Sequence, residues 1–383
     1  MAISSSSATF TRFFVPEFEE GDFWSFVDEK LRAGAFAEPD DSQTEAAGFA
    51  SWEDFFDPTF DFGSYRKAEY VAFHFRLDQK KVPSMVLKQF VRQSVQKYRD
   101  EHEGKWPSRS EKQEIQENMQ EYLLGRAFPQ PSACEVVWAP ANNLLMLGTT
   151  STKMMDAFLE FFERHFQVYP VPLYHAQWAA NKLPLTPGQK DTLGSIVTLK
   201  SPTALTDGRF LGSEFLTWLW YYIERLGGTI QAGDKVAEVH LGERMTLMLP
   251  ADGKEKVVCT TQANFLHEAR TALRQGKVVD EVQLLLIIGE NEYVLTLDSS
   301  LWALKGLKTP KQLPDYGSED PDGRFLEKMY FLEEASSALD SLYMRFLTER
   351  LTPGWESDTL VELQKWIDEG GVAPEGISPV AVA

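Results

Sequence analysis

The chain has 383 residues, long enough for two or three domains, and a formal net charge of −19. Apolar residues make up 43% and charged residues 25%, which is a globular composition. The acidic total argues against indiscriminate binding to nucleic acid. It does not exclude a local basic surface, because salt screens charges beyond roughly 8 Å.

Two further features bear on the compartment. Cys134 and Cys259 are the only cysteines, so we expect no disulfide framework and a reducing environment. The first residues, "MAISSSSATFTRFF", show neither the basic nor the apolar region of a signal peptide. The longest strongly apolar run, Leu284–Ile288, is far shorter than the ~20 residues that span a bilayer. We therefore expect a cytosolic protein with no membrane partner.

In the first half of the chain the apolar spacing alternates between strand and helix periods. It predicts a strand at 8–16, a helix at 21–36, a loop at 37–48, a strand at 69–78, two helical pieces between 80 and 126, a β-hairpin at 134–150, a helix at 151–166 and an extended segment at 168–175. Gly104 and Pro107 separate the two helical pieces, and Ser108 or Ser110 can cap the second. This predicts a helical hairpin. Asn142 and Asn143 are suited to the turn of the β-hairpin.

The second half begins after a segment rich in Pro and Gly at 179–192, which predicts a domain boundary. Beyond it the patterning predicts an apolar helix at 212–226, strands at 235–242, 245–253 and 256–262, a helix at 263–276, a strand pair within 277–307, a long helix at 323–351 and a short helical piece at 360–366. Residues 315–383 hold 15 acidic and 5 basic residues, a net charge of −10.

These elements predict a multi-domain α+β protein with antiparallel sheets, packed helices and a protruding helical finger. The predicted divisions are an N-terminal α/β domain (1–77 with 134–176), the finger (78–133), a C-terminal α/β domain (177–353) and an acidic tail (354–383).

The finger begins with an unusual concentration of positive charge. Residues 77–99 contain six basic residues and one acid, and residues 80–112 contain nine basic residues and four acids. On a helix, Lys88, Arg92 and Arg99 fall within about 40° of one another, beside an apolar arc. Such an edge matches the phosphates of DNA without reading bases, although it is equally compatible with a solvated helix face. The candidate DNA-binding residues are Lys88, Arg92, Arg99, Lys105, Arg109 and Lys112.

Several stretches, in consecutive order, resemble the recombination-associated RdgC family. They are "VPSMVLKQFVRQSVQKYR" (82–99), "EYLLGRAF" (121–128), "VVWAPANNLLMLGTTSTKMMDAF" (136–158), "YPVPL" (169–173) and, further on, "LRQGKVVDEVQLLL" (273–286). The resemblance implies a protein that binds double-stranded DNA without sequence preference, as a ring-shaped homodimer around a basic hole. It also implies that the protein limits access of the RecA recombinase to DNA, and hence a nucleoid-associated location.

The resemblance also implies roles for particular residues. "GRAF" matches the family motif at the end of the finger, so Arg126 and Phe128 are candidates for a dimer contact at the finger tip. Gln262 matches a DNA-binding position, but the basic pair that the family carries before it is replaced here by Thr260 and Thr261. Lys254 and Lys256, which lie upstream, are the candidates to compensate for the lost charges. The segment 208–230, the strands after it and the acidic tail do not match the shorter members of the family.

No pattern in the sequence indicates an enzyme. The six histidines are scattered without ligand spacing, and no phosphate-binding glycine loop is present. We therefore expect no catalytic residue, no metal and no cofactor. Two alternatives stay open: a metal-dependent DNA exonuclease, for which Asp252–Lys256 only vaguely resembles an acid-x-Lys arrangement, and a protein-binding module whose acidic C-terminal surface mimics DNA.

Overall fold

The computed structural model describes residues 2–16, 22–40, 43–173, 175–194, 209–250, 255–260, 265–310 and 320–369. Its strands are β1 (Ser7–Phe14), β2 (Glu45–Ala50), β3 (Arg66–Lys67), β4 (Tyr70–Lys80), β5 (Pro129–Ala139), β6 (Leu144–Leu147), β7 (Val171–Pro172), β8 (Thr229–Ala232), β9 (Lys235–Met248), β10 (Lys256–Thr260), β11 (Val278–Ile288), β12 (Asn291–Asp298) and β13 (Leu304–Lys308). Its helices are α1 (Phe23–Ala33), α2 (Ser84–Glu101), α3 (Arg109–Leu124), α4 (Thr152–Phe166), α5 (His175–Lys182), α6 (Pro187–Gly194), α7 (Arg209–Leu226), α8 (Phe265–Arg274), α9 (Pro321–Arg350) and α10 (Leu360–Asp368). The predicted α+β class is confirmed.

One antiparallel sheet runs through the whole body, in the order β10-β9-β11-β12-β13-β1-β6-β5-β4-β2. Strand β1 lies at its centre and changes partner along its length. Its first half pairs with β13, with Ser7 opposite Lys308, and its second half pairs with β6, with Phe14 opposite Leu144. A single strand therefore connects the two halves of the protein.

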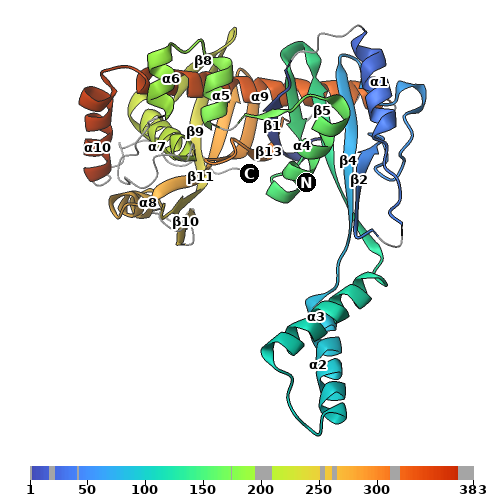
Figure 1. Cartoon of the computed structure of the whole chain (residues 1–383). Helices are drawn as coiled ribbons and strands as arrows, with labels where there is room; N and C mark the ends of the chain where they lie inside the picture. Colours follow the sequence, from blue (N-terminus) through green and yellow to red (C-terminus); the bar gives the residue numbers. More distant parts are fainter. Residues whose placement is uncertain are drawn as a thin grey trace.

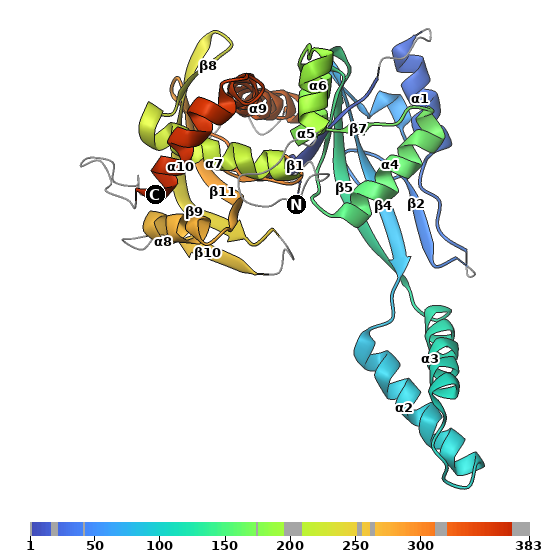
Figure 2. The ribbon, with the colours of Figure 1, turned by 60° about the vertical axis from the view of Figure 1, so that its left-hand side comes forward.

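Helices cover the sheet in two groups (Figures 1 and 2). The first group, α1 and α4, closes an aromatic core over β2, β4 and β5 that includes Phe49, Phe75 and Phe158. The second, α7 with α9 and α10, closes a larger core over β9, β11 and β12. Helix α9 spans both halves, because Phe325 near its start packs on Trp52 while its later turns pack on α7.

The helical finger is confirmed. Strands β4 and β5 pair as far as Lys80 and Pro129, and α2 and α3 project beyond that pair, away from the body (Figures 1 and 2). Ser108 caps α3 as predicted, and Ser151 caps α4. The chain break between the two finger helices lies where Gly104 and Pro107 predict it.

The structure corrects several element boundaries. Strand β2 occupies the end of the predicted loop at 37–48, and residues 277–307 form three strands in place of two. Helices α5 and α6 overlap the two ends of the predicted boundary segment at 179–192. The two strands expected at 235–253 are a single strand, β9. The chain bulges at Gly242 against β11, and Gln283 Oε1 accepts the backbone N–H of Glu243 at 2.8 Å. Gly242 is required at the bulge, since a Cβ there would lie 2.7 Å from the Gln283 side chain.

The predicted acidic tail is also corrected, because its first half belongs to the core. Trp355, Leu363, Trp366 and Ile367 are buried against the larger core. Trp366 Nε1 donates to Glu224 at 2.9 Å, across from α10 to α7. The segment is acidic overall, but its apolar residues bury one face of α10. Residues 370–383 lie outside the described part of the chain.

This packing yields a stability prediction. Trp366→Ala should lower the free energy of unfolding by about 3–5 kcal/mol, because it opens a cavity in the core. Val361→Ala, on the exposed side of the same helix, should change it by less than about 0.5 kcal/mol. Urea unfolding of both variants measures the difference. Equal, small effects would mean that α10 is only loosely attached to the body.

Candidate nucleic-acid interface

The finger is a thin structure whose two helices hold mainly to each other. Val95 is the only fully buried residue of α2, and α3 has none. A polar contact near the far end locks the pair: Tyr98 Oη donates to Glu111 Oε1 at 2.6 Å. The Tyr98 ring also stacks on His102, with 3.9 Å between ring centroids. The side of α2 turned away from α3 is therefore available for binding.

A capping box fixes the start of α3. Ser108 Oγ accepts the backbone N–H of Glu111, and the Glu111 carboxylate accepts the backbone N–H of Ser108 at 2.8 Å. Hydrogen bonds from Ser108 and Tyr98 lower the pKa of Glu111 to about 2. The same contact raises the pKa of Tyr98. Glu111 is thus a carboxylate whose hydrogen bonds hold the two finger helices together.

The predicted cations divide into two sets. Lys88 and Arg92 lie exposed on α2, while Lys105, Arg109 and Lys112 lie exposed at the tip, where α2 gives way to α3. Of the finger cations, the structure pairs Lys97 with Glu101, at 3.9 Å. None of these five is in an ion pair within the described residues. They are consequently free to meet phosphates.

Arg99 differs from the other predicted residues. Its guanidinium carbon lies 4.2 Å from the centre of the Trp106 ring, and its Nε donates to the Gly104 carbonyl at 3.4 Å. Arg99 shares the helix edge with Lys88 and Arg92, as predicted, but its head group turns to the tip. Trp106 was not among the predicted binding residues. Its position directly after Lys105, at the break between two helices, is the feature of the sequence that indicates an exposed aromatic side chain there.

The positive charge does not extend over the whole finger. Residues 113–124 of α3 carry Glu114, Glu117 and Glu121 and no basic residue. At 100° per residue these three carboxylates share one side of α3. The basic surface is therefore α2 and the tip, and the far side of α3 is acidic. We call the exposed cations of α2 and the tip the basic edge: Lys88, Arg92, Lys105, Arg109 and Lys112.

In the body, unlike in the finger, the basic side chains are mostly in ion pairs. Most of its lysines and arginines are paired with carboxylates, among them Arg12, Lys67, Arg76, Lys235, Lys256, Arg270, Lys277, Lys305 and Arg350. Ion pairing cancels the field of these groups at a distance. The basic edge is thus a concentration of unpaired charge and not merely of basic residues.

The predicted place of Arg126 and Phe128 is corrected. Both follow α3 directly and precede Pro129, which pairs with Lys80 in the β4–β5 ribbon. They lie at the base of the finger, whereas the tip is the turn at 102–108. The family motif marks the end of the helical segment along the chain, which in a hairpin returns to its base. Phe128 is 90% exposed, and the Arg126 guanidinium lies 4.1 Å from the Tyr122 ring. Whether the pair makes a dimer contact stays a prediction.

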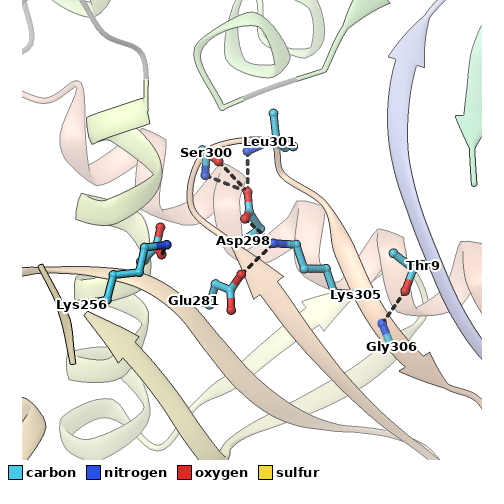
Figure 3. A network of polar contacts seen from close by, with 9 residues as sticks. Thr9, Lys256, Glu281, Asp298, Ser300, Leu301, Lys305 and Gly306 are labelled. Carbon is cyan, nitrogen blue, oxygen red and sulfur yellow. Dashed lines mark hydrogen bonds and ion pairs between the residues drawn. The ribbon is translucent and has the colours of Figure 1, made fainter. Parts of the chain in front are cut away.

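Gln262 lies outside the described residues, as does Lys254. Lys256 is described, and its Nζ lies 2.7 Å from the buried Asp280 carboxylate. On the neighbouring strands, Lys305 Nζ lies between Glu281 and Asp298, at 2.7 and 2.6 Å (Figure 3). The lysines of this region therefore neutralise carboxylates of the sheet, and we assign no DNA contact to them.

A comparison with protein families bears on the same part of the chain. Residues 22–183 match the model described as "Putative exonuclease, RdgC". The matched RdgC segment contains the whole finger together with α1, α4 and most of the strands around them. No curated protein matches the chain.

Across the described ranges, no three or more His, Cys, Asp or Glu side chains are grouped so as to hold a metal ion. Nor is any helix in those ranges both long and apolar enough to cross a bilayer.

The Glu111 contacts predict a pH dependence confined to the finger. Because the folded-state pKa is near 2 and the ordinary value is 4.5, the stabilisation is complete above about pH 4.5 and is lost as the pH falls toward 2. Glu111→Gln should therefore loosen α3 relative to wild type at pH 6 and much less at pH 2.5. Hydrogen exchange of α3 amides, corrected for intrinsic rates, measures this. A gap between the two proteins that does not change with pH would contradict it.

Proposed function

We propose that the protein binds double-stranded DNA without sequence preference, through the basic edge of its finger. The observation that carries the proposal is the contrast in ion pairing: cations are neutralised over most of the body and left unpaired on α2 and at the tip. From Lys88 to the end of α2 at Glu101 the helix rises about 20 Å, and the tip residues continue the basic edge beyond it, enough to follow several phosphates. Lysine and arginine side chains that contact phosphates, without side chains that contact base edges, give affinity for DNA but no sequence specificity.

The family supports a role in homologous recombination. A protein that occupies duplex DNA excludes other proteins from it by mass action alone. We propose that this chain limits RecA access in that way, with DNA as the shared partner and no direct contact required. Such a protein would work in the cytoplasm, associated with the nucleoid.

We further propose that two copies form a ring-shaped homodimer. A single finger offers few phosphate contacts, and a second copy doubles them while closing a path around the duplex. Phe128 supports an interface at the finger base, because its side chain is 90% exposed and burying so large an apolar surface against a partner would be favourable. The ring itself rests on the family resemblance.

The exonuclease alternative is supported by the description of the family model. The described residues lend it no further support. The carboxylates of Asp280, Glu281 and Asp298 on neighbouring strands are engaged by Lys256 and Lys305. Incubation of end-labelled linear duplex with Mg²⁺ separates the two functions: loss of full-length DNA that EDTA prevents would favour the nuclease.

The central prediction concerns charge. Lys88→Glu with Arg92→Glu should weaken duplex binding strongly and reduce the salt slope of log K by about 1.8, because about 0.9 is lost for each phosphate contact. The matched control is Lys153→Glu with Lys190→Glu, which makes the same change of −4 at exposed, unpaired lysines of the body. Fluorescence anisotropy over a salt series measures both. Equal effects of the two double variants would refute binding by the finger.

A second prediction concerns assembly. Phe128→Ala should weaken dimerisation by about 1.5–3 kcal/mol if the ring is buried by the partner, with no change in the unfolding of the monomer. Phe56→Ala, at an exposed phenylalanine of the body, is the control. Sedimentation equilibrium gives the dissociation constants. A Phe128 variant that dimerises like wild type would remove Phe128 from the interface.

A further inference from the structure

The finger presents a tryptophan at its extreme end. Trp106 lies in the turn between α2 and α3 and is 71% exposed. The turn is sharply defined: Glu103 and Gly104 have positive φ angles of 51° and 83°, and the Gly104 N–H donates to the Arg99 carbonyl at 2.8 Å. Pro107 follows directly and limits the backbone further. The indole is thus held outward by backbone geometry.

Arg99 packs on one face of the Trp106 ring, and we call the two side chains together the platform. Its guanidinium covers one face of the indole at 4.2 Å and is oriented by the Gly104 carbonyl and by Gln96 Oε1, both at 3.4 Å. Because one face is covered and 71% of the residue is still accessible, the opposite face must be open to solvent. A flat aromatic face backed by a cation is suited to stacking on another flat π-system.

The charges around the platform favour an anionic partner. Lys105, Arg109 and Lys112 are exposed and outside ion pairs among the described residues. The neighbouring acids are mostly engaged: Asp100 accepts from Gln96, Glu101 lies 3.9 Å from Lys97, and Glu111 closes the capping box. Glu103 is the remaining acid of the turn. An aromatic face flanked by unpaired cations is the arrangement that binds a nucleobase with its adjoining phosphates.

We propose that Trp106 stacks on an unpaired nucleobase, so that the finger tip recognises single-stranded arms or frayed ends next to duplex DNA. The proposal rests on the proposed DNA binding and adds to it a structural preference. The basic edge of α2 holds the duplex, and the tip engages the first unpaired base beyond it. Stacking tolerates any sequence, because every base has a π-face.

The test compares two DNA ligands, a blunt 30-base-pair duplex and the same duplex with an unpaired 10-nucleotide arm. Wild type should bind the tailed ligand more tightly. Trp106→Ala should lose about tenfold in affinity for the tailed ligand, with little change for the blunt one, and Trp106→Phe should retain most of the preference. Because the side chain is exposed, the fold should tolerate both changes, and unchanged blunt-duplex binding confirms it in the same experiment.

The outcomes separate the two proposals. A wild-type protein without preference for the tailed ligand, or a Trp106→Ala variant that keeps the preference, overturns base stacking while leaving duplex binding intact. Weaker dimerisation of Trp106→Ala with an unchanged preference shows that the tip contacts a second copy and also overturns it. Wild type that binds neither ligand overturns the proposed function and this inference with it.

Discussion

The architecture depends on one shared strand and the ion pair that anchors it. Strand β1 is hydrogen-bonded to β13 in one half of the body and to β6 in the other, and its Arg12 is 2% exposed. Both terminal nitrogens of Arg12 donate to the Asp340 carboxylate of α9, at 2.9 and 2.7 Å. A buried guanidinium without its carboxylate would destabilise the fold by about 3–5 kcal/mol. The pair therefore ties the central strand to the helix that spans both halves, and gives β4 and β5 a fixed base from which to carry the finger.

If the proposed DNA binding holds, neutralisation by ion pairs explains how a chain of net charge −19 attracts DNA. At long range the protein repels a polyanion, and only unpaired cations close to the phosphates can reverse this. The body uses its lysines and arginines to neutralise carboxylates, as Lys305 does between Glu281 and Asp298. The finger stands clear of the acidic body, and on it the charges separate: basic residues lie on α2 and the tip, acidic ones on the far side of α3. The distance from the body and the segregation of charge together leave a local positive field on the finger.

Local features of the sequence predicted the finger well. Contacts between residues far apart in the sequence were not predicted. The break at Gly104, the cap at Ser108 and the helical spacing of α2 are all encoded within a few residues, so the hairpin and most of its basic edge followed directly. The double pairing of β1 depends on strands almost 300 residues apart, which no local pattern reports. The same holds for Trp366, whose burial against α7 was hidden by the acidic composition around it. The place of Phe128 was missed for a topological reason, because the last residue of a hairpin returns to its base.

The account rests on DNA lying against α2 and the tip. Hydrogen-exchange mass spectrometry of the full chain, with and without a 30-base-pair duplex at low salt, tests this most directly, because it needs no variant and surveys every segment at once. We expect slower exchange on binding in residues 84–112, little change in residues 113–124, and none on the open face of the sheet at β10 and β11. Protection of the body with an unaffected finger would contradict the account.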